Sequence, residues 1–214
     1  HTREVFSVDI SDDGRYAISG GADTSIRIWD IQGKKQLQVI SSHTGAISAL
    51  GMTGNGERAI SASVDGTVRI WDLKADSGSV VDVMNTLFSS LGGSQYDNVI
   101  QYKGIINSFS ISPDGLKAVS GDRDGQFVLW DLEGKTYEIL CKDHLAVWGV
   151  AFVPDHPELC YCTRGPLLEV WHLPKKRVKA AFTADAVLHD CATNHAGDIV
   201  ISNDHYGTLF IHKL

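Results

Sequence analysis

Side chains that could support nucleophilic or metal chemistry occur in this chain, but their spacing is unfavourable for it. His189-Asp190-Cys191 places a potential base, acid and nucleophile on one predicted strand. Because neighbouring side chains on a strand alternate between its two faces, these three groups cannot all converge. The nine histidines are scattered, and none forms a metal-binding pair such as His-x-x-x-His on a helix. These residues predict neither a catalytic centre nor a metal site.

The four cysteines give no sign of redox or zinc chemistry. They are Cys141, Cys160, Cys162 and Cys191. Cys160 and Cys162 lie two residues apart in a strand-like run, a spacing that fits neither a zinc knuckle nor a CxxC pair. We expect buried or half-buried thiols in a reducing compartment, which predicts a cytoplasmic protein. The glycines lie in strand turns and not ahead of helices, so no phosphate-binding loop and no cofactor is predicted.

Charge and hydrophobicity exclude two classes of partner. The 214 residues carry 19 Lys and Arg against 26 Asp and Glu, a net charge of −7. An acidic domain repels phosphate backbones, so we expect no nucleic-acid partner. No apolar run reaches membrane-spanning length, so no membrane partner is expected. The sequence begins at His1 without Met, and we expect it to be a piece of a longer protein.

Internal repeats organise the chain. Four similar tetrapeptides, IWDI, IWDL, LWDL and VWHL, place tryptophan at positions 29, 71, 130 and 171, and a degraded fifth, IHKL, ends at residue 214. The intervals are 42, 59, 41 and 41 residues, counting His212 as the fifth position. Such a period is typical of repeat architectures. The second interval is longer by about 17 residues, which indicates an insertion.

Each repeat has the same internal order of strands and turns. In the second, strands are predicted at 47–52, 58–63 and 67–73, separated by turns at residues 54–56 and at Asp65-Gly66. Asp-Gly pairs between alternating apolar residues are hairpin signals, because glycine adopts positive φ without steric cost. A fourth strand follows each tryptophan strand. Each unit is therefore predicted to be a four-stranded antiparallel meander, which must pack against its neighbours to bury both faces.

The period, the Asp-Gly turns and the Trp-Asp ends resemble the WD40-repeat family over essentially the whole chain. The resemblance implies an all-β β-propeller with blades at about 1–42, 43–101, 102–143, 144–183 and 184–214. Only four fourth strands are found for five sets of the first three, so the last blade is predicted to lack its outer strand. We expect these five blades to belong to a larger ring of seven or eight.

The same resemblance implies a buried chain of Trp, Ser, His and Asp within each blade. The second unit matches with His43, Ser61, Asp65 and Trp71, and the first with His1, Ser19, Asp23 and Trp29. In such a chain each buried donor finds an acceptor. A Ser, His and Asp together also suggest catalysis. Because the trio recurs and each copy ends on a tryptophan, we interpret these sets as structural and predict no enzyme activity.

The later units depart from this pattern. The third keeps Ser120, Asp124 and Trp130 but has Tyr102 at the histidine position. The fourth keeps His144 and Trp171, with Tyr161 and Gly165 expected at the Ser and Asp positions. The fifth keeps only Ser202, with Ala184, Tyr206 and His212 elsewhere. We expect these blades to depend more on apolar packing.

Residues 76–93 break the strand pattern. Val80, Val83, Met84, Leu87 and Phe88 fall at helical spacing, which predicts a short helical insertion between the third and fourth strands of the second blade. Twelve residues are marginal for an isolated helix in water, so its apolar face must be covered. Docking on the propeller's own rim and contact with a partner through Val83, Leu87 and Phe88 both remain open.

Loops at the opposite end of the blades are the other candidate interface. In the WD40 family, peptides usually bind across this face, around the central channel. The candidate residues here are Thr44, Val64, Arg123, Leu145, Arg164 and His205. The two arginines could pair with acidic groups of a partner, or could be solvated charges.

Three functions are compatible with this sequence. The run Phe182 to Ala192 resembles the final blade of C-terminal propellers in bacterial STAND signalling NTPases, which implies a non-catalytic sensor or autoregulatory propeller that binds a protein or peptide. The alternative is a scaffold subunit of a multiprotein complex. A propeller enzyme would need converging acids or metal ligands on the innermost strands. Those strands offer Asp9, Ser48, Asn107, Trp148 and His189, which form no such set.

Overall fold

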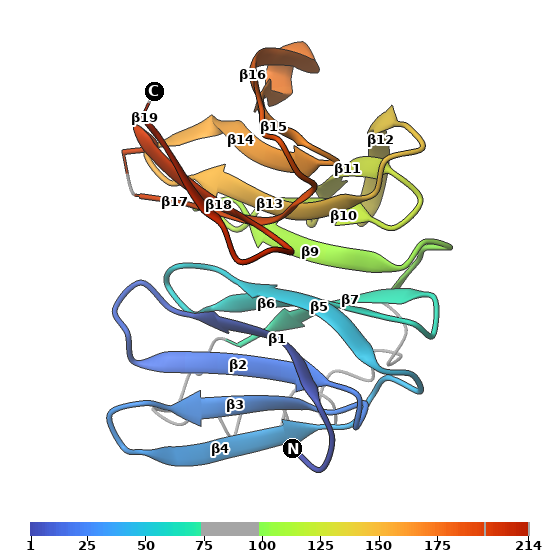
Figure 1. The fold of residues 1–214 in the computed structure, drawn as a ribbon. Coiled ribbons are helices and arrows are strands. Elements are labelled where there is room, and N and C mark those ends of the chain that lie inside the picture. The colour runs from blue at the N-terminus through green and yellow to red at the C-terminus, as the bar shows by residue number, and fades with distance from the viewer. Residues whose placement is uncertain (74–98, 195, 214) are drawn as a thin grey trace. The chain divides into compact units, whose positions relative to one another are not determined.

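The structure is a computed structural model that describes residues 1–73, 99–194 and 196–213 (Figure 1). The described residues form five antiparallel sheets, numbered here in chain order, and a single short 3-10 helix. The all-β prediction is therefore confirmed. The chain divides into two compact units, residues 1–103 and 104–214, and each unit is described by itself.

The first unit contains two four-stranded sheets, each with its strands in sequence order. The first sheet consists of β1 (Val5–Ile10), β2 (Tyr16–Gly21), β3 (Ile26–Asp30) and β4 (Lys35–Ile40). The second sheet consists of β5 (Ile47–Met52), β6 (Arg58–Ser63), β7 (Thr67–Asp72) and β8 (Val99–Gln101). The predicted strands of this repeat agree with β5 and β6 and extend one residue beyond β7.

The second unit contains two four-stranded sheets and one sheet of three described strands. The third sheet consists of β9 (Ile106–Ile111), β10 (Lys117–Asp122), β11 (Gln126–Asp131) and β12 (Thr136–Lys142). The fourth consists of β13 (Val147–Val153), β14 (His156–Arg164), β15 (Leu167–His172) and β16 (Arg177–Thr183), with η1 (Leu173–Lys175) before β16. The fifth consists of β17 (Leu188–Thr193), β18 (Ile199–Asp204) and β19 (Leu209–Lys213).

Strand register places the repeated tryptophans at corresponding points of successive sheets. Trp29, Trp71 and Trp130 pair with Ala17, Ala59 and Ala118, respectively, on the preceding strand. Trp171 pairs with Cys160, and His212 pairs with Val200. The tetrapeptide repeat therefore predicted the third strand of every sheet correctly.

The Asp-Gly pairs form the turns that their chemistry predicts. Gly14 and Gly115 have φ of 65° and 69° between the first and second strands of their sheets. Gly66 and Gly125 have φ of 81° and 76° between the second and third strands. Glycine adopts this left-handed backbone without the steric cost that a Cβ atom brings.

The core lies between neighbouring sheets within each unit. In the first unit, Ile18 and Ile28 of the first sheet pack with Leu50, Met52 and Trp71 of the second. In the second unit, one cluster joins the third and fourth sheets and another joins the fourth and fifth. Burying both faces of inner sheets in this way is the main apolar stabilisation of the fold.

Side chains of first strands also hydrogen-bond to the first strand of the following sheet. The Met52 amide donates to the Asp9 carboxylate at 2.7 Å, and the Leu50 amide donates to the Ser7 hydroxyl at 3.1 Å. In the second unit, the Phe152 amide donates to the Ser110 hydroxyl at 3.0 Å. Asp9, considered above as a central-channel acid, therefore joins two sheets.

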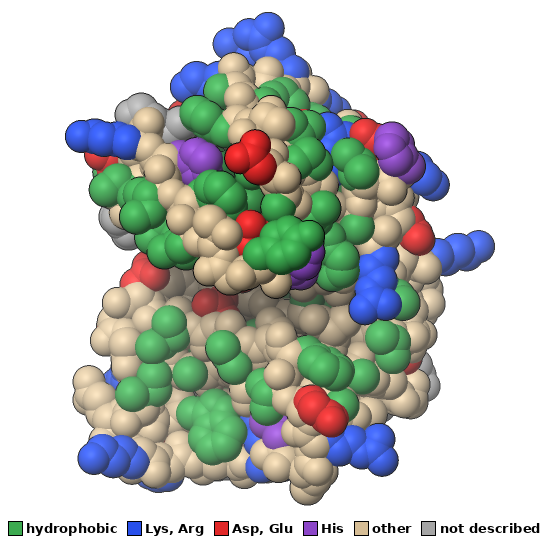
Figure 2. Space-filling view, in the orientation of Figure 1, with side chains coloured by type: hydrophobic (Ala, Val, Ile, Leu, Met, Phe, Trp, Pro, Cys, Tyr) green, Lys and Arg blue, Asp and Glu red, His purple; other side chains and the backbone are tan. Residues whose placement is uncertain are grey.

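The first and last sheets leave apolar side chains open to solvent. Val8 of β1 is 69% exposed, whereas Leu50, at the same position of the second sheet, is 4% exposed. In the last sheet, Ile211 is 67% exposed, whereas Ile28 at the same position of the first sheet is 2% exposed. The face drawn in Figure 2 shows hydrophobic side chains at the surface of both units.

Some predictions fall outside the described residues. The helical insertion at 76–93, with the partner candidates Val83, Leu87 and Phe88, lies there, so it stays a prediction. Among the residues that are described, no helix is long and apolar enough to cross a membrane.

Candidate functional site

The second sheet carries the most complete polar network. The Trp71 indole N–H donates to the Ser61 hydroxyl at 2.9 Å. Ser61 Oγ lies 2.9 Å from His43 Nε2, and His43 Nδ1 lies 2.9 Å from Asp65 Oδ2. Because the carboxylate can only accept, the imidazole proton is on Nδ1, and the Ser61 hydroxyl donates to Nε2.

The surroundings of this network shift the pKa values of both ionisable members. Burial lowers the pKa of His43 below its ordinary value and outweighs the opposing effect of the Asp65 carboxylate. Burial also acts to raise the pKa of Asp65, but hydrogen bonds from Thr67, Thr44 and His43 outweigh it and lower the pKa to about 2. Neutral histidine and ionised aspartate are therefore the resting forms in the folded protein.

The first sheet has the same connections. The Trp29 indole donates to Ser19 Oγ at 2.9 Å, and Ser19 Oγ lies 2.8 Å from His1 Nε2. His1 Nδ1 lies 2.8 Å from the Asp23 carboxylate, which also accepts from the Thr2 amide. The structure thus brings together all four predicted residues in each of the first two sheets.

These networks share the hydrogen-bond order of a Ser-His-Asp catalytic triad, but two features oppose catalysis. The serine oxygen already accepts a hydrogen bond from tryptophan, and Ser61 is only 1% exposed. His43 is 5% exposed. A nucleophile must reach the reacting carbonyl in an open site, which this arrangement does not provide.

In the third sheet the prediction for Asp124 is wrong. The Trp130 indole donates to Ser120 Oγ at 2.9 Å, as expected. Asp124, however, is exposed, because Tyr102 stands at the histidine position and no imidazole is present to pair with it. The buried carboxylate is that of Asp122, which accepts from the Gln126 amide and side chain at 2.7 and 2.8 Å.

The fourth sheet has a different network, which the sequence analysis missed. The Trp171 indole donates to Glu169 Oε2 at 2.9 Å, and the other Glu169 oxygen pairs with the Arg164 guanidinium. Arg164 also donates to Asp143 Oδ2 at 3.1 Å. Strand register places Cys162, and not Tyr161, opposite Glu169 at the serine position. A buried carboxylate here replaces the serine as the acceptor for the tryptophan.

The fifth sheet keeps the serine without its partners. Ser202 Oγ and His212 Nε2 are buried and find no hydrogen-bond partner among the described residues. The carboxylate of Asp204 accepts from the Thr208 and Tyr206 amides and shapes the turn between β18 and β19. Ala184 supplies no polar group at the histidine position.

The predicted interface residues differ in their accessibility. Thr44, Val64, Arg123 and His205 are exposed, and Leu145 is half-buried. The Arg164 side chain is only 13% exposed and is ion-paired with Glu169 and Asp143, so the prediction that it faces a partner is not supported. Its pKa is raised because the bond to Glu169 outweighs the lowering effect of burial.

In the second unit, His205 belongs to a row of stacked aromatic rings. Trp148 and His189 stack with centroids 5.2 Å apart, and His189 lies 5.8 Å from His205. The Tyr206 ring centroid lies 3.8 Å from that of His205, and Tyr206 is 77% exposed. These rings join the first strands of the fourth and fifth sheets to the turn between β18 and β19. His205 and Tyr206 are the exposed rings of this row, in a turn at the end of the sheets where the candidate interface was predicted.

The buried thiols fit a structural role. Cys141, Cys160, Cys162 and Cys191 are free, and burial raises the pKa of Cys160, Cys162 and Cys191. His189 and Cys191 lie on β17 with Asp190 between them, and the Asp190 carboxylate accepts from the Cys191 amide at 2.8 Å. Within residues 1–73, 99–194 and 196–213, no group of three or more metal-ligating side chains occurs.

Comparison with known proteins agrees with this architecture. Residues 1–30, 34–72 and 96–131 match the WD40 family, described as WD domain, G-beta repeat. The chain is 34% identical over 206 residues to the small ribosomal subunit protein RACK1 of Caenorhabditis elegans. The match covers 83% of this chain but only 63% of that relative's length. The chain therefore carries WD40 repeats, and its antiparallel sheets have the form of β-propeller blades.

Proposed function

We propose that this chain is a non-catalytic protein-interaction module and acts as a scaffold subunit of a multiprotein complex. One observation carries the proposal. The Ser-His-Asp sets are turned inward and closed by tryptophan, whereas the loops at the same end of the sheets expose Thr44, Val64, Arg123 and His205. The side chains that could support catalysis are buried, whereas the loop residues that could contact a partner are exposed.

The similarity to a small ribosomal subunit protein favours the scaffold over the sensor propeller of a signalling NTPase. That relative is a component of a large assembly by its description, and it matches most of this chain. The sensor interpretation depends on the run from Phe182 to Ala192 alone, and it stays a prediction. A Walker-type loop elsewhere in the parent protein would favour it.

The proposed partner is a protein. The net charge of −7 disfavours nucleic acid. The row formed by Trp148, His189, His205 and Tyr206 ends in two exposed rings, and aromatic residues are enriched at protein interfaces. Four free cysteines suit a reducing compartment, so a cytoplasmic location is part of the proposal.

The proposal includes a ring larger than five blades. Val8 and Ile211 are more than half exposed, although residues at the same positions of inner sheets are buried. Apolar faces of this kind are normally covered, and further blades of the parent protein would cover them. Aspartate at Val8 in the full-length protein should then lower its melting temperature, and an unchanged melting temperature would count against additional blades.

The test uses the affinity-tagged full-length protein at its natural expression level. We expect it to purify in a complex of fixed composition. His205→Glu combined with Arg123→Glu should release partner subunits while leaving the melting temperature unchanged. Lys175→Glu, on η1 at the other end of the fourth sheet, is the matched control and should retain them. A protein that purifies alone, or a complex indifferent to the double variant, would contradict the proposed interface.

A further inference from the structure

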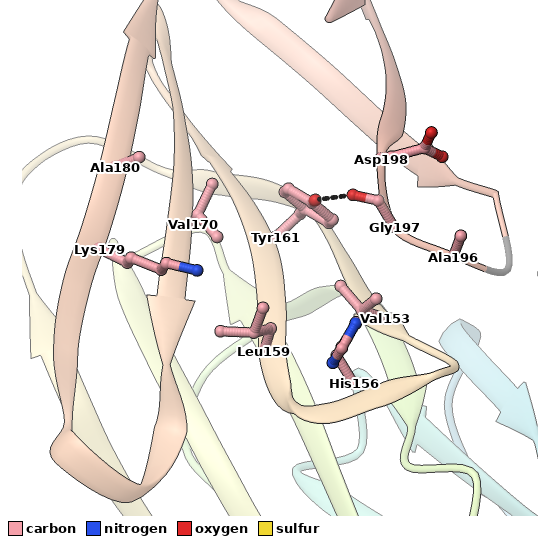
Figure 3. A pocket seen from close by; sticks show the side chains of 10 residues that line it. All are labelled: Val153, His156, Leu159, Tyr161, Val170, Lys179, Ala180, Ala196, Gly197 and Asp198. Carbon is pink, nitrogen blue, oxygen red and sulfur yellow. Dashed lines mark hydrogen bonds between the residues drawn. The ribbon is translucent and has the colours of Figure 1, made fainter. Parts of the chain in front are cut away.

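A pocket of about 310 Å³ lies in the second unit, between the fourth and fifth sheets (Figure 3). Its walls come from β14, β15, β16 and the end of β13 in the fourth sheet and from the turn between β17 and β18 of the fifth. This size is at the lower end for ligand sites, suited to one or two side chains rather than to a large cofactor.

The walls of the pocket are fixed. The Tyr161 hydroxyl donates to the Gly197 carbonyl at 2.7 Å and holds the β17–β18 turn against the fourth sheet (Figure 3). Gly197 has φ of +73°, and a Cβ atom there would lie 2.2 Å from a methyl group of Val153. The turn can therefore approach this closely only with glycine. Burial, with smaller effects of Cys191 and Asp198, raises the pKa of Tyr161 to about 12, so the phenol remains a donor.

A lysine lines the pocket at a place where another sheet has leucine. In β16, Ala180 pairs with Val170 and Val178 with Trp171, which leaves Lys179 as an extra residue in a bulge. The first sheet has the same bulge at the same register, and its extra residue is Leu37. Leu37 packs against the core between the first and second sheets. Bulges re-aim side chains, so Lys179 and its neighbour Ala180 both line the pocket.

The amine of Lys179 is available to pair with a ligand. Lys179 forms no ion pair or hydrogen bond with any residue that the structure describes, and its side chain extends toward the pocket (Figure 3). The other walls near it are aliphatic, from Leu159, Val170 and Ala180. An aliphatic space with one free cation at its edge is complementary to an aliphatic group that carries a carboxylate close by.

The remaining charged groups around the pocket are compatible with such a ligand. Asp198 lies on the opposite wall and already accepts from the Asn194 side-chain amide at 2.6 Å. His156 Nδ1 lies 3.5 Å from Glu158. Arg177 precedes Lys179 on β16, which carries two cations and no acid in an otherwise acidic protein.

We propose that this pocket binds a short segment of a partner protein in which a Leu, Ile, Val or Met side chain stands next to Asp or Glu. The aliphatic side chain fills the space between Leu159, Val170 and Ala180, and the neighbouring carboxylate pairs with Lys179. The inference rests on the proposed protein-interaction function but concerns a surface separate from the loops around His205.

Fluorescein-labelled hexapeptides test the proposal directly. The set pairs each of the four aliphatic residues with Asp or Glu, and the matched controls replace the acid by its amide or the aliphatic residue by Ser. Fluorescence anisotropy measures binding to the protein. At least one acidic aliphatic peptide should bind, and its amide and serine controls should bind about tenfold more weakly or worse.

Lys179→Leu is the decisive variant, because it restores the residue found at the same bulge of the first sheet. It should fill the pocket, raise the melting temperature and abolish peptide binding. Lys175→Leu, outside the pocket, should leave binding unchanged. Failure of every peptide to exceed its serine control, or equal binding by Lys179→Leu, would overturn the proposal. Equal competition by octanoate would also overturn it, in favour of a free carboxylate.

The outcome is separable from that of the proposed function. If the peptides fail while His205→Glu with Arg123→Glu still releases partners, the pocket proposal is wrong and the scaffold remains. If the peptides bind but the full-length protein purifies alone, the scaffold proposal is wrong.

Discussion

The second and fourth sheets, which belong to different units, use different side chains to accept the hydrogen bond of the equivalent tryptophan. The Trp71 indole N–H meets a serine hydroxyl, backed by His43 and Asp65. The Trp171 indole N–H meets the Glu169 carboxylate, backed by Arg164. In both sheets a buried donor has an acceptor and the acceptor has its own partner. The repeat therefore preserves hydrogen-bond satisfaction rather than a particular set of residues.

The comparison also explains why the Ser-His-Asp sets need not be catalytic. If these sets were catalytic, the fourth sheet would have lost its catalytic residues. If they only provide an acceptor for the buried tryptophan, the ion pair between Glu169 and Arg164 replaces them adequately. The unpartnered Ser202 and His212 of the fifth sheet mark the case in which no replacement is present among the described residues.

The largest effect is expected from removing the tryptophan of the second sheet. Trp71→Ala leaves a cavity and takes the donor away from Ser61, and large-to-small changes of this kind cost about 3–5 kcal/mol. Urea denaturation should show a fall of this size in the free energy of unfolding. A change below about 1 kcal/mol would mean that Trp71 is not a core residue of this sheet.

Removing the carboxylate of the fourth sheet is expected to cost about 3 kcal/mol. Glu169→Ala leaves the Arg164 charge without its buried partner and orphans the Trp171 indole, and such broken pairs are strongly destabilising. Glu169→Gln keeps an acceptor for Trp171 and should lose less. Equal losses for both variants, measured by urea denaturation, would show that the acceptor for Trp171 contributes nothing beyond the charge that pairs with Arg164.

Acid should weaken the second sheet in two steps. The pKa of His43 is lowered in the folded protein, so stability is complete above about pH 6.5 and falls as the pH drops below it, because the unfolded chain binds a proton first. The pKa of Asp65 is lowered to about 2, so its contribution is present above about pH 4 and is lost as the pH falls toward 2.

Melting temperatures between pH 8 and pH 2 measure both steps. His43→Gln should remove the step below pH 6.5 and keep part of the lower one. If the wild type and His43→Gln have parallel profiles between pH 7 and pH 5, the assignment to His43 is wrong.

The smallest effect concerns a turn of the first sheet. Thr24 has φ of 64°, whereas Gly66, Gly125 and Gly207 occupy the same place in other sheets with φ of 81°, 76° and 85°. A β-branched residue is strained there, so Thr24→Gly should raise the free energy of unfolding by up to about 1 kcal/mol. Gly66→Thr should lower it. A destabilising Thr24→Gly would show that the Thr24 side chain makes a compensating contact.

The sequence was sufficient to predict the first three strands of the second repeat and the tryptophan strand of the other repeats, because these strands repeat a local pattern of alternation and turn residues. In the fourth sheet it placed Tyr161 at the serine position, where the register has Cys162. It also identified the complete sets in the first two sheets, since His1 and His43 stand in register with Ser19 and Ser61. The prediction for Asp124 was wrong because a sequence pattern does not show whether an acidic side chain has a partner. The buried carboxylate of this sheet is that of Asp122, two residues earlier.

The ion pair and the pocket needed coordinates. Arg164 and Glu169 lie five residues apart across a shortened turn, where charged residues are ordinarily solvated. The pocket depends on which residue of β16 is extra in the bulge. Aligning Gln36-Leu37-Gln38 with Val178-Lys179-Ala180 could have suggested it, but only once the bulge was known.

A double-mutant cycle between Ser61 and Trp71 tests the central claim most directly. Ser61→Ala removes the acceptor, Trp71→Phe removes the donor, and the double variant removes both. Urea denaturation should give a coupling energy of about 1 kcal/mol between the two sites, with the double variant less destabilised than the sum of the singles. Additive losses would mean that the serine does not satisfy the tryptophan, and would contradict the structural role assigned to these networks.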